Sequence, residues 1–291
     1  MRPEEQPEGW VHPCDLCGSL EYEPASEEDE RLRRCHVCGL IQLPGETERP
    51  SSIRTIDQRT FNAIVRRLVG RHRNERPFRV LVIGPLRERT RRILEDSSIL
   101  LEHLSGSIDS GGYPPETFDI ILCTRSLDSV NSIGSLFAHA RTWLRPLGLF
   151  VTGSANWESV ERRLWTSRWL RNHPDGRQYP GYSQLKAYAT RYGFEVVTSG
   201  TTVSLGSIAR TGFGSGSGPL RLLALPIGVL GWLPRLGSSC WGVLVKRGLA
   251  TRPVLDRAAE EVAPSTGLAA AGYMPTTHVR REGSNEPHLR N

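Results

Sequence analysis

The chain has 291 residues, a formal net charge of +6 and 38% hydrophobic residues, which suits one core domain with smaller appendages. No run reaches the roughly 18 apolar residues that a membrane-spanning helix needs, and the opening "MRPEEQPEGW" lacks the apolar stretch of a secretory signal. We therefore expect a cytoplasmic protein rather than a membrane or exported one.

Two CxxC pairs, in "CDLCGS" and "CHVCGL", come first along the chain. They supply Cys14, Cys17, Cys35 and Cys38, and a glycine follows each pair. Four thiolates in a tetrahedral arrangement form the ligand set of structural Zn²⁺. So short a segment has little core, and metal binding would supply most of its folding free energy. We predict a zinc ribbon over residues 1–48; a redox pair is the alternative, and it fits poorly because no βαβ pattern surrounds either CxxC.

Beyond a linker, strand-like and helix-like patterns alternate along the chain. Continuous apolar runs such as "FRVLVIG" are typical of strands buried on both faces of a parallel sheet. Alternating strands and helices predict a doubly wound α/β sheet. The predicted strands are residues 78–84, 98–104, 118–124, 149–155, 194–205 and 240–247, and the predicted helices are residues 51–73, 87–96, 129–148, 158–173 and 182–193.

Two later segments break this alternation. A Gly/Ser-rich linker leads into the apolar segment 219–236, which Pro226 and Pro234 interrupt. We expect a helical hairpin that covers the sheet edge or a substrate cleft; a peripheral membrane or protein contact is the alternative. The last residues are polar, lack periodicity and are expected to be disordered. The predicted parts are the ribbon at 1–48, a core domain at 49–250 with the apolar helical insertion at about 216–238, and a tail at 251–291.

The order and spacing of these pieces resemble class I S-adenosylmethionine-dependent methyltransferases that carry an N-terminal zinc ribbon. The resemblance covers residues 14–248. It implies a Rossmann-like sheet with the cofactor across the carboxyl ends of the first strands. The pieces that carry it are the CxxCG knuckles, "VLVIG", "PPETFDIILCTRSLDSV", "ARTWLRPLGLFVTGSAN", "YSQLKAYATRYGFEVV" and "WGVLVKR".

The resemblance implies four cofactor-binding residues. Gly84 ends the first strand, but "PLRERT" follows where the family usually shows further glycines. Glu102 matches the acid that accepts the ribose hydroxyls, with a solvated strand-end carboxylate as the alternative. Asp109 could reach the adenine amino group or be a turn residue, and Thr124 stands at the end of the next family strand. The short span from Gly84 to Phe118 leaves little room, so we expect the family's second helix and third strand to be cut down or absent.

Candidates for proton transfer to or from an acceptor are few. Relatives often have an acidic residue and a histidine after the strand at 118–124, and here Asp128 is available. His173 and Tyr179 lie in the region expected to face the substrate; ordinary loop solvation is the alternative for both. Cys123 and Cys240 are expected only to pack in the core.

These features predict a methyltransferase that uses S-adenosylmethionine and acts on a small glycan-like or natural-product acceptor, such as a sugar or sugar nucleotide. The alternative is an inactive domain of the same fold that serves as a scaffold or binds a partner. The arginines suit a solvated surface or an anionic partner. A nucleic-acid-binding ribbon is disfavoured because the first fifty residues are acidic.

Overall fold

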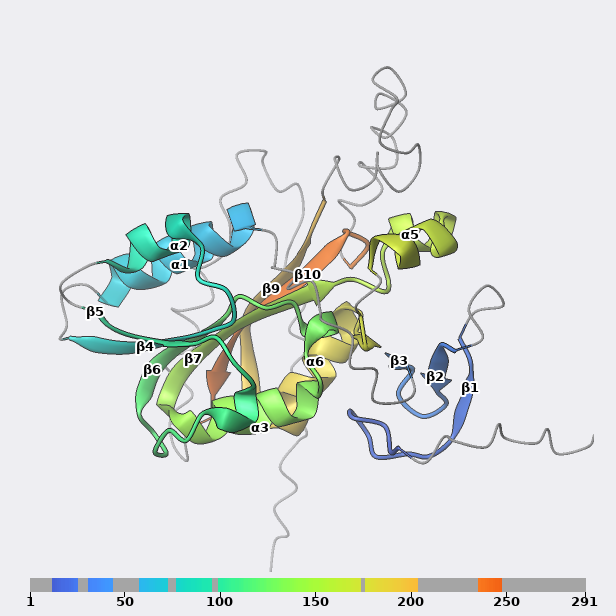
Figure 1. Cartoon of the computed structure of the whole chain (residues 1–291), viewed down its shortest axis with the longest axis horizontal. Helices are drawn as coiled ribbons and strands as arrows, with labels where there is room; N and C mark the ends of the chain where they lie inside the picture. The colour runs from blue at the N-terminus through green and yellow to red at the C-terminus, as the bar shows by residue number, and fades with distance from the viewer. Residues whose placement is uncertain are drawn as a thin grey trace, which may run out of the picture.

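The structure is a computed structural model that describes residues 12–25, 31–43, 58–72, 77–95, 99–173, 176–203 and 235–247. The apolar segment 219–236, except its last two residues, and the tail 251–291 lie outside the described residues, so their predicted structures stay predictions. Figure 1 shows a twisted central sheet with helices on both faces and a smaller sheet at one end. In the part of the chain that is described, no helix is long and apolar enough to cross a membrane.

The central sheet has six strands, and their order reverses between the second and the third. Four strands run parallel, and β10 runs antiparallel to both of its neighbours. A reversal of this kind is a switch point, where ligands bind at the carboxyl ends of the strands. The doubly wound sheet is therefore confirmed. In spatial order the strands are β5 (Ile99–Leu104), β4 (Phe78–Ile83), β6 (Phe118–Cys123), β7 (Leu144–Ala155), β10 (Ser239–Lys246) and β9 (Phe194–Thr202).

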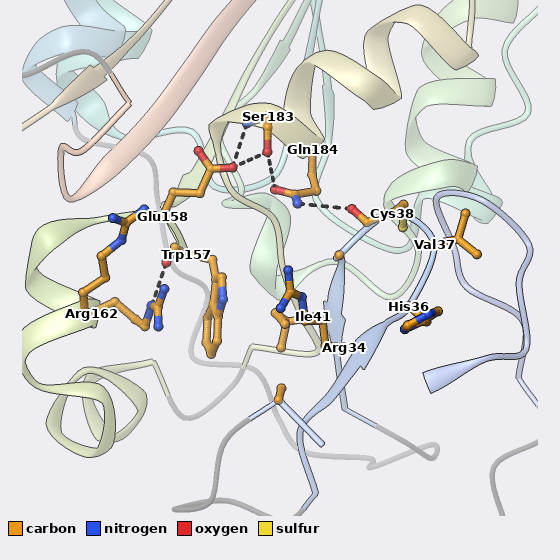
Figure 2. A pocket seen from close by; sticks show the side chains of 13 residues that line it. Arg34, His36, Val37, Cys38, Ile41, Trp157, Glu158, Arg162, Ser183 and Gln184 are labelled. Atoms are coloured by element: carbon orange, nitrogen blue, oxygen red, sulfur yellow. Dashed lines mark hydrogen bonds between the residues drawn. The ribbon is translucent and has the colours of Figure 1, made fainter. Parts of the chain in front are cut away.

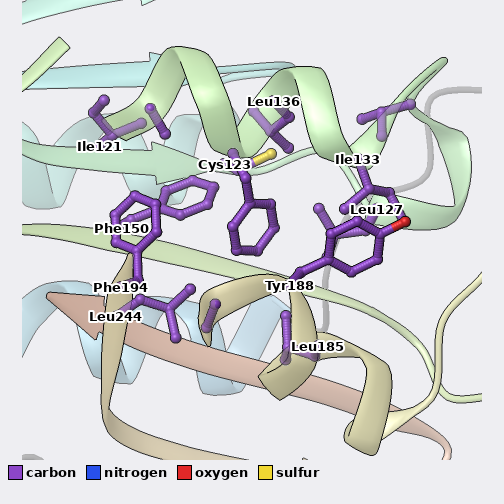
Figure 3. Close-up of a cluster of buried hydrophobic side chains, with 14 of the residues drawn as sticks. Ile121, Cys123, Leu127, Ile133, Leu136, Phe150, Leu185, Tyr188, Phe194 and Leu244 are labelled. Atoms are coloured by element: carbon purple, nitrogen blue, oxygen red, sulfur yellow. The ribbon is translucent and has the colours of Figure 1, made fainter. Parts of the chain in front are cut away.

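Both faces of the sheet are covered, which explains the unbroken apolar strands. Side chains alternate along β4, so Leu81 and Ile83 enter one core cluster while Val80 and Val82 enter the other. Figure 3 shows the first cluster, where Phe150 and Tyr188 meet side chains of the covering helices. The helices of the first cluster are α3 (Ile133–Trp143) and α6 (Tyr182–Arg191), and those of the second are α1 (Gln58–His72) and α2 (Glu88–Leu94).

Among the predicted helices, those at 129–148 and 158–173 differ most from the structure. Ser132 caps α3, because its hydroxyl accepts a hydrogen bond from the Ser135 N–H at 2.9 Å, so the helix begins later than predicted. It ends at Trp143, before Pro146, whose ring cannot continue a helix, and the following residues already belong to β7. The predicted helix at 158–173 is two short helices, α4 (Val160–Leu164) and α5 (Thr166–Asn172).

The crossover from β5 to β6 is unusually short. Residues 105–117 contain only a 3-10 turn, η1 (Ile108–Ser110), so the expectation that the family's second helix and third strand are cut down or absent is confirmed. The crossover packs on the α3 side of the sheet. There Tyr113 meets Phe118 and Trp143 edge-on, with ring centroids 5.1 and 5.3 Å away. β5 is consequently the edge strand of the described sheet.

The cysteine segment builds a second sheet that includes a strand from far along the chain. Its strands are β1 (Tyr22–Pro24), β2 (Arg33–Cys35), β3 (Ile41–Gln42) and β8 (Gln178–Tyr179), in that order. β8 pairs antiparallel with β3, and the Leu43 N–H donates to the Arg177 carbonyl at 2.9 Å. The sequence pattern predicts no strand here and places Tyr179 in a region facing the substrate, with a solvated loop as the alternative. Instead, β8 is the strand that joins the cysteine segment to the core domain.

Candidate metal centre and cofactor edge

The two CxxC turns bring four sulfur atoms together. The Sγ atoms of Cys14 and Cys38 lie 3.5 Å apart, those of Cys17 and Cys35 lie 3.4 Å apart, and all four lie within 4.8 Å of one another. Four sulfurs bound tetrahedrally at about 2.3 Å from an ion would be spaced by about 3.8 Å. The four cysteines could therefore hold a metal ion, and the set leaves no ligand position open for water or substrate.

The glycine after each pair is required by the backbone. Gly18 and Gly39 have φ values of +80° and +71°, a region that favours glycine. In each turn the glycine N–H donates a hydrogen bond to the carbonyl of the first cysteine of the pair. The distances are 2.7 Å from Gly18 to Cys14 and 2.9 Å from Gly39 to Cys35. The sequence pattern CxxCG thus has a direct conformational reason.

The electrostatics of the cluster favour a cation. A hydrogen bond from Cys38 lowers the pKa of the Cys14 thiol to about 5, against the opposing effect of burial. The same bond, and then burial, raises the pKa of Cys38. Burial and then the charges of the nearby sulfurs raise the pKa of the Tyr22 phenol. The shared hydrogen bond therefore favours the thiolate form of Cys14, which is the form that binds a metal ion.

Asp15, inside the first knuckle, attaches the cysteine segment to α3 and α6. Its carboxylate accepts hydrogen bonds from the Ser132 hydroxyl at 2.5 Å, the Gly134 N–H at 2.8 Å and the Tyr188 hydroxyl at 2.8 Å. Ser132 and Gly134 lie at the start of α3, where the helix dipole also favours a negative charge. Burial, followed by the charge of Asp15 and its hydrogen bond, raises the pKa of Tyr188.

Two further contacts hold the cysteine segment against α6. The Gln184 side-chain amide donates to the Cys38 carbonyl at 3.4 Å, and Arg191 donates to the Leu16 carbonyl. The two carbonyls belong to the two CxxC turns, one to each. The candidate metal centre is therefore fixed to the core domain from two helices and from β8.

At the switch point, Gly84 takes a conformation that only glycine accepts readily. Its φ is +99°, and a Cβ there would lie 2.9 Å from both the backbone nitrogen and the Cβ of Arg125. Its N–H donates to the Leu104 carbonyl at 2.9 Å, and the His103 Nε2 lies 2.7 Å from the Gly84 carbonyl. The first turn thus keeps the close backbone approach expected of it, and its own polar groups are engaged by β5.

Thr124 joins Gly84 at this edge. Its hydroxyl lies 3.1 Å from the Ile83 carbonyl and 2.9 Å from the Pro85 carbonyl, and its N–H donates to the Ile83 carbonyl at 2.9 Å. Of the four predicted cofactor residues, the structure brings these two together. The loop after β6 is thereby tied to the loop after β4.

Glu102 lies farther from the carboxyl end of the parallel strands than Gly84 and Thr124 do. It is paired with Leu81 rather than with Ile83, two residues before the end of β4. One of its carboxylate oxygens lies 3.4 Å from the Arg79 guanidinium, and its charge, after burial, raises the pKa of the Tyr113 phenol. The carboxylate is directed at Arg79 and lies close to the crossover.

Asp109 lies in η1 against α3. Its side chain is 72% exposed and lies 3.4 Å from the His139 Nε2, and it accepts from the Ser135 hydroxyl at 3.2 Å. Neither Asp109 nor Glu102 has a described contact with Gly84 or Thr124. Their cofactor roles stay predictions.

Two buried polar atoms on the loop after β6 test whether a cofactor fits at this edge of the sheet. In the described part of the chain, Arg125 Nε and Asp128 Oδ2 are buried without a hydrogen-bond partner. Buried polar groups are normally paired, so a pair of orphans on one loop indicates a place for a ligand or water. These atoms, and the glycine cradle (the space at Gly84 that a Cβ would fill), suit a cofactor that Gly84, Thr124 and Arg125 would hold at this edge of the sheet.

Asp128 is fully buried beside the end of β7. Its Oδ1 accepts from the Ser126 hydroxyl and lies 3.4 Å from the Ser154 hydroxyl, while its carbonyl accepts from the Arg177 N–H at 2.8 Å. With no exposed surface, it touches no acceptor in this arrangement. A role in proton transfer would need a channel or a movement of this loop, and it stays a prediction.

Tyr179 and His173 meet in an aromatic cluster. The Tyr179 hydroxyl donates to the His173 carbonyl at 2.7 Å, and the His173 ring stacks on Trp169 at 4.0 Å between centroids. Trp157 packs edge-on against Trp169, at 5.6 Å. The structure brings these two candidates together, and the contacts described give them packing roles near β8. Their part in catalysis also stays a prediction.

Cys123 and Cys240 are buried in the core. Burial raises the pKa of each thiol to about 12. Thiols of this kind are protonated at neutral pH and unreactive. Their surroundings agree with the expected packing role.

Several important residues carried no recognisable signal in the sequence. Asp15 reads as a spacer between cysteines, and its partners on α3 and α6 lie more than a hundred residues away. Arg34, Arg162 and Arg163 read as scattered surface charges. They are far apart in the sequence and come together only in the fold, where all three line one cleft.

Comparison with known proteins places this architecture. A family model described as "Methyltransferase domain" matches residues 49–199, more than half of the chain. Similar solved structures include the YcgJ protein from Bacillus subtilis, with 14% identity, a TM-score of 0.44 and coverage of 63% of this chain and 98% of that one. A SAM-dependent methyltransferase from Archaeoglobus fulgidus has 13% identity, a TM-score of 0.43 and coverage of 64% and 94%. The search among curated proteins gave no match.

Proposed function

The chain belongs to the methyltransferase-domain family, and from that premise we propose that it methylates a small acceptor with S-adenosylmethionine as donor. The acceptor class we favour is a glycan-like or natural-product molecule, such as a sugar or sugar nucleotide. The observation that carries the proposal is the glycine cradle at Gly84, at the switch point of the sheet, with φ +99°. When bound, the cofactor supplies a methyl group already activated on its sulfonium.

The protein's own part is binding and alignment. The missing Cβ of Gly84 allows a ligand to approach the backbone, and Thr124 holds the two loops in register. The orphaned Nε of Arg125 offers a charged donor to a carboxylate. We assign the ribose hydroxyls to Glu102 and the adenine amino group to Asp109, and Glu102 would have to exchange its contact with Arg79 to reach them.

We further propose that the four cysteines bind structural Zn²⁺. A full set of four sulfur ligands suits zinc and excludes a catalytic role for the ion. The contacts of Asp15, Gln184 and Arg191 support a scaffolding role, because they connect the metal-binding turns to α3 and α6.

A specific observation also favours the second candidate, a scaffold without activity. The groups of the first turn already have partners: Gly84 bonds Leu104 and lies against His103, and the Pro85 carbonyl meets Thr124. Pro85 also lacks the N–H that a further glycine would supply. Such a closed turn would suit a fold retained for binding a partner.

Calorimetric titration of the zinc-loaded protein with S-adenosylhomocysteine separates the two candidates. Micromolar binding that weakens in Arg125→Gln supports the methyltransferase. The matched control is Arg89→Gln, an exposed arginine on α2, which should bind like the wild type. Absence of binding at millimolar ligand would overturn the enzyme proposal in favour of the scaffold.

A further inference from the structure

A cleft separates the second metal-binding turn from the residues that follow β7. It has a volume of about 550 Å³. One wall comes from β2 and the second CxxC turn; the other comes from Trp157, α4 and the first turn of α6. Figure 2 shows charged side chains reaching into it from both walls. The volume is that of a small-molecule site, roughly 300–1,000 Å³.

Three arginines line this cleft. Arg34 comes from β2, and Arg162 and Arg163 come from α4. Arg34 lies 3.5 Å from Glu23, in a pair that is about half exposed. The Arg162 Nε donates to the Trp157 carbonyl at 2.7 Å, and its guanidinium lies 4.6 Å from the Trp157 ring centroid. Among the described residues, neither Arg162 nor Arg163 forms an ion pair with a carboxylate.

The positive charges of the cleft repel one another. Burial lowers the pKa of Arg162, and the neighbouring charges of Arg163 and Arg34 lower it further. A cluster of cations in a partly buried cleft is stabilised when an anion lies among them.

Glu158 is the one carboxylate among the described residues that line the cleft, and its hydrogen-bond donor, Ser183, lines the cleft too. Glu158 accepts hydrogen bonds from the Ser183 hydroxyl and, at 3.3 Å, from the Ser183 N–H at the start of α6. Figure 2 shows it directed towards Ser183. The negative charge of Glu158 disfavours an anion beside Ser183. An anion would therefore bind at the other end of the cleft, between Arg34 and α4.

We propose that this cleft binds a phosphate-bearing small molecule, with Arg34, Arg162 and Arg163 as the phosphate ligands. Guanidinium groups bind phosphate oxygens in a bidentate manner, and groups from two opposite walls suit a diphosphate. Glu23 and Glu158 interrupt the positive surface, so a compact anion fits better than a nucleic-acid strand. The proposal does not depend on methyl transfer.

The test is calorimetric titration of the zinc-loaded full chain with inorganic pyrophosphate at low salt. Arg163 is exposed and suits substitution. We expect 1:1 binding that weakens about tenfold in Arg163→Gln and in Arg34→Gln, since each removes a charge-assisted contact. The double variant should show no saturable binding. Arg89→Gln, which removes one charge outside the cleft, should stay within about twofold of the wild type.

Three outcomes would overturn the proposal. The first is no saturable pyrophosphate binding by a folded, zinc-loaded wild type. The second is equal weakening by Arg89→Gln, which would mean diffuse attraction by net charge. The third is loss of bound zinc in Arg34→Gln with pyrophosphate affinity unchanged, which would mean that the arginine balances thiolate charge. Protection of Arg34 and Arg163 from phenylglyoxal by pyrophosphate, with Arg89 still modified, would support the site directly.

Discussion

Polar groups are paired in opposite ways in two regions of the molecule, where the cysteine segment meets the core domain and at the switch point of the sheet. At the proposed metal-binding end, which is the cysteine segment with its contacts on α3, α6 and β8, polar groups find partners far away in the sequence. The Asp15 carboxylate takes all its described donors from α6 and the start of α3. At the switch point, Gly84, Pro85 and Thr124 satisfy one another and the neighbouring β5. The first end depends on the rest of the fold, while the second is locally closed.

We therefore expect substitutions at the first end to change mainly the stability of the fold, and those at the switch point to change mainly ligand binding. Damage at the metal-binding end should spread into α3 and α6, because the start of α3 and several positions along α6 hold the cysteine segment. Damage at Gly84 should stay local and act mainly on ligand binding. The predictions that follow compare the two ends, from the largest expected effect to the smallest.

Removing the metal should have the largest effect. Metal binding contributes folding free energy on the order of 10 kcal/mol in small zinc modules. We therefore expect chelation, or Cys35→Ser, to unfold residues 12–43 and to speed hydrogen exchange at the start of α3. Zinc content by elemental analysis and exchange by mass spectrometry measure this. Cys123→Ala, at a buried cysteine outside the cluster, should keep the zinc; unchanged exchange after complete metal loss would contradict the prediction.

Asp15→Ala should destabilise the protein by about 3 kcal/mol, because it leaves the Gly134 N–H without its acceptor and leaves the Tyr188 hydroxyl only the longer bond to Gln178, at 3.3 Å. Urea unfolding measures the change. The control is Asp109→Ala, an exposed carboxylate that also contacts α3, which should cost less than about 1 kcal/mol. Equal effects of the two substitutions would show that the metal-binding end is not anchored through Asp15.

Gly84→Ala should cost about 2 kcal/mol, because alanine is strained at φ +99° and its Cβ would meet Arg125. It should also abolish binding of S-adenosylhomocysteine. Gly70→Ala is the matched control: Gly70 lies in α1 with no atom within 4 Å of an added Cβ, so it should stabilise by about 0.5–1 kcal/mol. If Gly84→Ala binds the ligand as well as the wild type does, the cradle is not the cofactor site.

Sequence reasoning succeeded where a local pattern fixes the outcome. The apolar runs located the strands of the central sheet, and the short span before Phe118 predicted the lost strand, since that count needs no tertiary information. The CxxCG pairs predicted converging sulfurs because turn geometry is set by a few neighbouring residues. Each of these inferences rests on residues close together in the chain.

The rest depended on contacts that no local pattern encodes. β8 is two residues long, too short for an alternation signal, and it forms only because β3 offers an edge. Glu102 matched the family's ribose-binding acid by its position near the end of a strand, but the register of β5 against β4 pairs it with Leu81. The arginine cleft likewise depends on the docking of β2 near α4. Register and docking are tertiary properties, so residue spacing could not supply them.

Tyr188→Phe tests the metal-binding end through pH. The folded-state pKa of Tyr188 is raised above its ordinary value of 10.0 by burial and by Asp15. Its stabilising contribution is therefore fully present below pH 10 and is lost as the pH rises above it, at about 1.4 kcal/mol per pH unit. The phenylalanine variant should be less stable at neutral pH and should lose stability less steeply above pH 10. Parallel urea-midpoint curves for the two proteins would contradict this.

Glu102→Gln should have the smallest effect on stability, under about 1 kcal/mol, because its pair with Arg79 is partly exposed and screened by solvent. Its effect on ligand affinity sharpens the comparison of the two ends. If Glu102 leaves Arg79 to accept the ribose hydroxyls, S-adenosylhomocysteine should bind about tenfold more weakly, the loss of a charge-assisted hydrogen bond. Glu88→Gln breaks another surface pair, with Arg92 on α2, and should leave the affinity unchanged. Equal affinity in both variants would mean that the ribose is held elsewhere, and that the register of β5 has removed this acid from the cofactor edge.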